Sequence, residues 1–159
     1  MCNTPFQPPR PTAPALQYLQ VTVTDIDESL AFYRDALGLE LVNDLGSGDK
    51  RWVTLSSPAQ PGLEYVLSRP HAGRTQEDGD ALQTLLTKGI LPMLVFTTDD
   101  LDATFERVRA AGAEVLQEPV DRPWGPRDSA FRDPSGTTVR IQQGEVVLRS
   151  RVKAPATTA

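Results

Sequence analysis

The chain has 159 residues, 39% of them hydrophobic and 23% charged, as expected for one globular domain or two tightly fused half-domains. A formal net charge of -5 without a basic cluster argues against nucleic acid as a partner. No apolar run approaches the roughly 20 residues that cross a bilayer, and residues 1–10 lack the apolar centre of a secretory signal, so we expect a cytoplasmic protein without a membrane partner.

The first half of the chain reads as one strand, one helix and three further strands. Residues 1–15 are rich in Pro and polar residues and are expected to form a disordered tail. Apolar and polar residues alternate over residues 16–23, which predicts a strand with two different faces. A helix capped by Asp25 or Asp27 then ends at Gly38. Strand-like runs follow at residues 39–43, 51–56 and 63–68.

The second half repeats this order after a linker. Residues 71–92 form the linker, with a short helix expected at residues 80–88. The second half is predicted to contain a strand at residues 93–98, a helix at 100–111 and strands at 114–117, 128–132 and 138–142. The repeat indicates an internal duplication. It divides the chain into modules at residues 16–70 and 93–145, with a C-terminal tail at residues 146–159.

Few residues of the chain offer metal-binding or nucleophilic chemistry. Cys2 is the single cysteine and lies in the predicted tail, while His71 is the single histidine and lies in the linker. The chain contains no CxxC, GxSxG or GxGxxG motif, so zinc, hydrolase and nucleotide chemistry have no support. Acidic residues do cluster at the two helix starts. We interpret them as helix caps rather than as a cation site.

Two segments carry a resemblance to a known family. They are Asp-Ile-Asp-Glu-Ser-Leu-Ala-Phe-Tyr-Arg-Asp-Ala-Leu-Gly at residues 25–38 and Phe-Arg-Asp-Pro-Ser-Gly at residues 131–136. With this order of elements, residues 16–143 resemble the vicinal oxygen chelate superfamily of glyoxalase I, extradiol dioxygenases, fosfomycin-modifying enzymes and bleomycin resistance proteins. The resemblance implies an α+β fold of two tandem βαβββ modules that curl a mixed sheet around a cleft, often with a second subunit. The Pro-Trp-Gly of residues 123–125 is similar to the bleomycin-resistance-like branch, where neighbouring residues line the ligand groove.

The resemblance also locates the positions that bind metal in other members. They fall on Tyr18, Glu64, Met93 and Arg140, and only Glu64 suits a hard or borderline cation. Met is a poor ligand for such ions, and Arg carries a permanent positive charge. We therefore expect neither a metal nor another cofactor.

Strand alternation indicates which side chains would line the cleft. The candidate ligand-binding residues are Tyr18, Gln20, Trp52, Glu64, Met93, Trp124, Arg140 and Gln142. Their aromatic rings and thioether suit flat, partly apolar compounds. Alternatively, Tyr18, Trp52 and Met93 fill the barrel interior, and Trp124 either forms a rim of the site or covers a sheet edge.

An inward-facing guanidinium requires an anion. We therefore hypothesise an ion pair between Arg140 and Glu64, the alternative being an exposed Arg140 at a frayed strand edge.

The function that this sequence predicts is binding. We expect a metal-free homodimer that sequesters an aromatic or amphipathic compound and has no catalytic residues. The alternative is a glyoxalase-like lyase, isomerase or dioxygenase, either with atypical metal ligands or with Glu64 and Tyr18 as acid-base groups. An Arg140 partner would make Glu64 a weaker base, which argues against that chemistry. A structural or regulatory role has no supporting feature in the sequence.

Overall fold

The computed structural model describes residues 12–146. Most of the two predicted tails, residues 1–11 and 147–159, lies outside that range. The first module contains β1 (Tyr18–Thr22), α1 (Ile26–Leu30), η1 (Ala31–Ala36), β2 (Glu40–Leu45), η2 (Gly48–Lys50), β3 (Trp52–Ser57) and β4 (Gln60–Ser68). After α2 (Gln76–Thr87), the second module contains β5 (Leu94–Thr98), α3 (Leu101–Ala110), β6 (Glu114–Arg122), β7 (Gly125–Arg132) and β8 (Thr138–Gln143).

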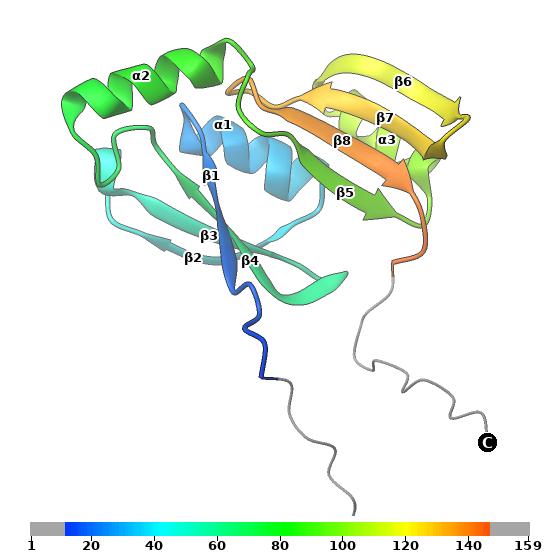
Figure 1. Ribbon diagram of the computed structural model, residues 1–159, viewed down its shortest axis with the longest axis horizontal. Coiled ribbons are helices and arrows are strands. Elements are labelled where there is room, and N and C mark those ends of the chain that lie inside the picture. Colours follow the sequence, from blue (N-terminus) through cyan, green and yellow to red (C-terminus); the bar gives the residue numbers. More distant parts are fainter. Residues whose placement is uncertain (1–11, 147–159) are drawn as a thin grey trace, which may run out of the picture.

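Each module forms its own four-stranded mixed sheet. The strand orders are β1-β4-β3-β2 and β5-β8-β7-β6, and in each sheet the first strand pairs in parallel with the last one. The other pairings are antiparallel. Figure 1 shows two separate sheets, connected through the segment that carries α2. The predicted α+β fold of two tandem βαβββ modules is confirmed.

The two module helices begin at aspartate caps. The Asp25 carboxylate accepts a hydrogen bond from the backbone N–H of Glu28 at 2.9 Å, and Asp100 accepts one from Ala103 at 3.0 Å. Such caps satisfy backbone donors that have no partner within the helix. Asp27, the other candidate, forms an ion pair with Arg51 at 2.8 Å instead. The predicted capping role of the helix-start carboxylates is thus confirmed at Asp25 and Asp100.

The first helix widens into a π-helical segment at Ala31–Ala36. The backbone N–H of Leu37 donates to the carbonyl of Phe32 at 2.9 Å, five residues earlier. This segment buries Phe32 and Tyr33 side by side, with their rings edge to face at 4.9 Å between centroids. Both aromatic rings of the segment can therefore enter the core.

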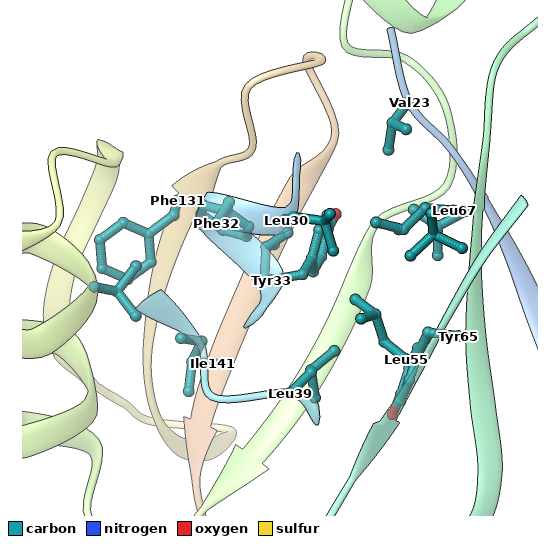
Figure 2. Packing of buried hydrophobic residues seen from close by; sticks show 14 of the residues in the cluster. Val23, Leu30, Phe32, Tyr33, Leu39, Leu55, Tyr65, Leu67, Phe131 and Ile141 are labelled. Atoms are coloured by element: carbon teal, nitrogen blue, oxygen red, sulfur yellow. The ribbon is translucent and has the colours of Figure 1, made fainter. Parts of the chain in front are cut away.

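One hydrophobic core joins the two modules. It combines the helix-facing side of both sheets with α1, η1 and α3, and Figure 2 shows Leu30 and Tyr33 between Phe131 of the second module and Leu67 of the first. The Tyr33 hydroxyl donates to the buried Asp133 at 2.7 Å. Asp133 also accepts backbone hydrogen bonds from residues 135–137 of its turn. The first helix is thereby attached directly to the last hairpin of the chain.

The structure corrects two element boundaries. Helix α2 begins at Gln76 rather than near residue 80, because the Thr75 hydroxyl caps it by accepting from the backbone N–H of Asp78 at 3.1 Å. Strands β6 and β7 extend into the segment between the predicted strands at residues 114–117 and 128–132 and leave only a tight turn between Arg122 and Gly125. Strand β6 lies at the sheet edge, where its Pro119 and its irregular register are tolerated. No helix within residues 12–146 has the length and apolarity to cross a membrane.

Candidate functional site

Each sheet has one face in the core and one face turned away from it. Directly paired residues of neighbouring strands project on the same side of a sheet. In the first sheet, Tyr18 pairs with Glu64, and Val66 lies between Gln20 and Thr54. The side of the first sheet that is turned away from the core, here called the first open face, carries Tyr18, Gln20, Trp52, Thr54, Glu64, Val66 and Ser68.

The first open face is well packed at its centre and accessible at its rim. Val66 and Ser68 are buried, and the Gln20 amide donates to the Ser68 hydroxyl at 2.6 Å. Trp52 is half-buried, whereas Tyr18 at the rim is 53% exposed. The interior-filling alternative therefore does not hold for Tyr18 in the single chain.

The corresponding side of the second sheet, here called the second open face, is more polar. It carries Val95, Thr97, Gln117, Arg122, Asp128, Ala130, Arg140 and Gln142. The Gln142 amide donates to the Thr97 hydroxyl at 3.2 Å. Met93 lies two residues before Val95, and these two side chains are 54% and 52% exposed. Core packing alone therefore does not account for Met93 either.

A carboxylate at the centre of the second open face binds two guanidinium groups. Asp128 is only 8% exposed, and its two oxygens accept from Arg140, from Arg122 at 3.0 Å and from the Gln117 amide at 2.8 Å. Burial raises the pKa of this carboxyl, but the hydrogen bonds from Arg140, Gln117 and Arg122 outweigh it, and the pKa lies below its ordinary value. Asp128 is therefore charged at neutral pH.

The hypothesised ion pair between Arg140 and Glu64 is wrong within one chain. Arg140 pairs with Asp128 on the adjacent strand, and no ion pair of Glu64 occurs among residues 12–146. The adjacent strand offers a carboxylate two residues from the position opposite Arg140, whereas Glu64 belongs to the other sheet. The alternative of a frayed edge also fails, because β8 is an inner strand and the Arg140 side chain is 28% exposed.

The site residues predicted from the sequence did not include Asp128, Gln117 and Arg122. A signal for Asp128 was present, because strands expected at residues 128–132 and 138–142 around a four-residue turn form a hairpin that places Asp128 near Arg140. No comparable signal existed for Gln117 and Arg122. Both lie on the irregular edge strand β6, where register shifts break the simple alternation.

Trp124 lies at the tip of the hairpin between β6 and β7. Its side chain is 81% exposed, and the guanidinium carbon of Arg122 lies 5.9 Å from the ring centroid. Such a separation permits a cation–π contact. Trp124 therefore does not cover the sheet edge and stands beside the second open face.

The predicted ligand-binding residues fall into two groups. The first open face holds Tyr18, Gln20, Trp52 and Glu64, and the second open face holds Arg140 and Gln142, with Met93 and Trp124 next to it. In the part of the chain that the structure describes, no hydrogen bond or ion pair links the two groups.

Two cavities lie at the seam between the modules, and Val95 and Thr97 of the second open face line the second of them. Their volumes are about 550 and 510 Å³, and Phe96 and Thr97 line both of them. None of the eight predicted residues lines either cavity. The role of these eight residues stays a prediction.

The four positions that correspond to metal ligands do not suit a divalent ion here. Tyr18, Met93 and Arg140 provide a phenol, a thioether and a guanidinium, and Arg140 is already bound to Asp128. Over the described range 12–146, no three His, Cys, Asp or Glu side chains are grouped closely enough to hold a metal ion. This set of side chains does not fit the divalent metal ion of the catalytic members, and no reaction step of this protein is assigned to such an ion.

A comparison with protein-family models identifies the superfamily of the chain. Residues 15–141 match the family model of the Glyoxalase/Bleomycin resistance protein/Dioxygenase superfamily. The chain belongs to this superfamily. The resemblance read from residues 25–38 and 131–136 is thereby confirmed.

Solved structures of similar proteins support the same fold. The crystal structure of UcmS2 is 32% identical and superposes with a TM-score of 0.75, over 84% of this chain and all (100%) of that one. TnmS3, an antibiotic binding protein from Streptomyces sp. CB03234, is 24% identical with a TM-score of 0.65, over 86% of this chain and 100% of its own. At that identity the likeness to TnmS3 shows the fold alone.

Two curated proteins with sequences similar to this chain are informative. The uncharacterized protein YurT of Bacillus subtilis is 29% identical over 127 residues, which are 77% of this chain and 94% of YurT. The anthracycline biosynthesis protein DnrV of Streptomyces peucetius is 30% identical over 152 residues, 89% of this chain. The match occupies 50% of DnrV, so the chain spans about half the length of that relative.

Proposed function

We propose that the protein binds a small aromatic or amphipathic compound on its open faces, without a metal and without catalysis. The observation that carries this proposal is the exposure of large apolar side chains on the sides of both sheets turned away from the core. Tyr18 is 53% exposed there, two residues before the amide of Gln20 on the same strand. On the second sheet Val95 is 52% exposed opposite Arg140, and Met93, two residues earlier, is 54% exposed. Apolar surface rimmed by polar groups is typical of a ligand or partner site.

The proposal includes a homodimer in the cytoplasm. In a single chain the two open faces form no shared pocket with the predicted residues, and the cavities at the seam have other linings. A second copy that packs its second sheet against the first sheet of its partner encloses both faces and shields the exposed Tyr18 and Met93 from water. Two-fold symmetry then produces two equal sites.

The relatives support a ligand of this kind. DnrV is named an anthracycline biosynthesis protein, and anthracyclines are compounds of the small aromatic class proposed here. The fold is also that of TnmS3, an antibiotic binding protein, so it is compatible with small-molecule binding. Neither likeness transfers a particular ligand. The proposal therefore rests on the residues of the open faces.

Tryptophan fluorescence tests the proposal, because the chain has two tryptophans, Trp52 and Trp124. Trp52→Phe and Trp124→Phe each leave one reporter. We expect saturable quenching by planar probes such as anthraquinones and naphthalenes in both variants. Tyr18→Ala weakens binding several-fold, and Leu85→Ala, which removes a 40% exposed apolar side chain on α2, serves as the matched control. Quenching that rises linearly without saturation for every probe would contradict the proposal.

One observation favours the catalytic alternative. Glu64 has no ion-pair partner among the described residues and is in register with Tyr18, so a carboxylate and a phenol lie side by side on the first open face. Within one chain Arg140 does not weaken Glu64 as a base, because Arg140 binds Asp128. Turnover of a glyoxalase or dioxygenase substrate that disappears in Glu64→Gln would establish catalysis in place of simple binding.

A further inference from the structure

We propose that the ligand carries a negative charge, such as a carboxylate or sulfonate on an aromatic frame, and that Arg140 and Arg122 bind this anion. The inference deepens the proposed function and rests on it. It concerns the chemical class of the ligand and its orientation. The net charge of the whole chain is -5, so an anion needs a local cationic site.

The network on the second open face has more positive than negative charge. Arg122 and Arg140 both pair with the same carboxylate, that of Asp128, and their side chains are 24% and 28% exposed. Two neighbouring arginines have carboxylates of their own. Arg127 pairs with Asp102 at 2.7 Å and lies 3.7 Å from Asp121, and Arg132 lies 3.6 Å from Glu114. Arg122 and Arg140 share the single carboxylate of Asp128, so their own ion pairs leave one positive charge at this position.

The two guanidinium groups also have unused donors. Within residues 12–146, Arg140 donates a hydrogen bond only through Nη1, and Arg122 donates only through Nε and Nη2. Arg140 thus presents Nε and Nη2, a pair of donors that matches the two oxygens of a carboxylate. Asp128 already holds both side chains in place, so a ligand loses little of its binding energy in ordering them.

The surroundings of these donors suit an aromatic frame. The exposed indole of Trp124 lies beside Arg122, and Met93 and Val95 offer apolar surface along β5. The first open face, by contrast, carries Glu64 and no arginine or lysine. A ligand with one anionic end and one apolar end is therefore oriented, with its charge on the second open face.

A pair of probes with the same shape separates charge from stacking. Anthraquinone-2-carboxylate is an anion, and anthraquinone-2-carboxamide is neutral and nearly isosteric. Calorimetric titration at pH 7.5 and low salt is expected to give at least about tenfold tighter binding of the carboxylate, because charge-assisted bidentate hydrogen bonds are roughly twice as strong as neutral ones. The preference shrinks as salt rises, because these partly exposed charges are screened.

Variants assign the preference to the two arginines. Arg140→Gln and Arg122→Gln each reduce the carboxylate preference towards unity while the carboxamide binds as before, and Arg140→Lys retains part of the preference. Arg127→Gln, which removes an equally accessible guanidinium paired with Asp102, keeps the full preference. Circular dichroism and sedimentation confirm that each variant keeps the fold and oligomeric state, and Arg122→Gln decides the question if Arg140→Gln does not fold.

The outcomes distinguish the two proposals. Equal affinity for carboxylate and carboxamide, or a preference that survives in both arginine variants, overturns the anion inference and leaves the binding function intact. Failure of both probes and of the wider aromatic panel to bind overturns the proposed function as well.

Discussion

At the residue scale, one buried hydrogen bond contributes to the connection between the modules alongside their shared core. Tyr33 donates to Asp133 at 2.7 Å, and both residues are at most 3% exposed. Tyr33→Phe leaves a buried carboxylate without one of its donors. We expect a loss of about 1–3 kcal/mol in the free energy of unfolding, measured by urea denaturation. Tyr65→Phe is the control, because its 3.2 Å bond to Gln60 is partly accessible to water, and an equal loss in both variants would contradict the special role of Tyr33.

A second prediction at this scale concerns acid stability. The pKa of Asp128 is lowered from 3.8, because the bonds from Arg140, Gln117 and Arg122 overcome the opposing effect of burial. A carboxyl with a depressed folded-state pKa stabilises the protein above its unfolded-state pKa, and this stabilisation is lost as pH falls through the folded-state value. The stability advantage of the wild type over Asp128→Asn is therefore expected to be constant near neutral pH and to shrink below 3.8.

Denaturant titrations of both proteins at a series of pH values measure this difference. The buried Asp133, whose pKa is raised chiefly by burial, titrates in both proteins, and its contribution cancels. If the stability difference between the wild type and Asp128→Asn stays constant down to the lowest pH at which both proteins fold, the arginines do not stabilise the charged form of Asp128.

The sequence predicted which face of its own sheet a site residue lies on better than it predicted the ion-pair partner of that residue. Strand alternation predicted that Tyr18, Glu64, Arg140 and Gln142 all line one cleft. In the structure Tyr18 and Glu64 share the first open face and Arg140 and Gln142 share the second, and a common cleft stays a prediction. The partner of Arg140 was wrong because an ion pair depends on hairpin register and side-chain reach, which alternation does not specify. The positions of these residues in the sequence also do not indicate whether the first and second open faces lie close to each other.

At the element scale, the helix caps make a matched test possible. Asp25 caps α1 through its hydrogen bond to the backbone N–H of Glu28, whereas Asp27, two residues later, only pairs with Arg51 at an exposed position. Asp25→Ala is expected to lower the free energy of unfolding by about 1 kcal/mol, a typical effect of removing an N-cap. Asp27→Ala is expected to change it by a few tenths of a kcal/mol. Thermal and urea unfolding measure both, and a larger effect at Asp27 would reverse the assignment of the cap.

Element order was predictable, while element detail was not. Apolar periodicity located both module helices and the strands because burial determines that pattern. The π-helical segment at Ala31–Ala36 has no such signal, since it follows from how Phe32 and Tyr33 fit the shared core. The early start of α2 depended on a Thr75 cap that lies outside the apolar pattern.

At the scale of the whole molecule, the proposal requires a second copy of the chain. Sedimentation velocity at micromolar concentration is expected to show a dimer of the 17.4 kDa chain. Val95→Asp places a charge on a 52% exposed apolar position of the second open face and is expected to favour the monomer. Leu85→Asp on α2 is the control. A monomer at all concentrations would exclude the two-copy site and would leave the open faces as separate surfaces.

The proposed function requires that this superfamily member binds its ligand without a metal. Calorimetric titration of an anthraquinone probe into protein dialysed against EDTA, with a parallel titration after addition of Ni, Mn, Fe or Zn, measures this. We expect saturable binding with one probe per chain and the same affinity in every titration. Binding that appears only when a divalent ion is added would contradict it.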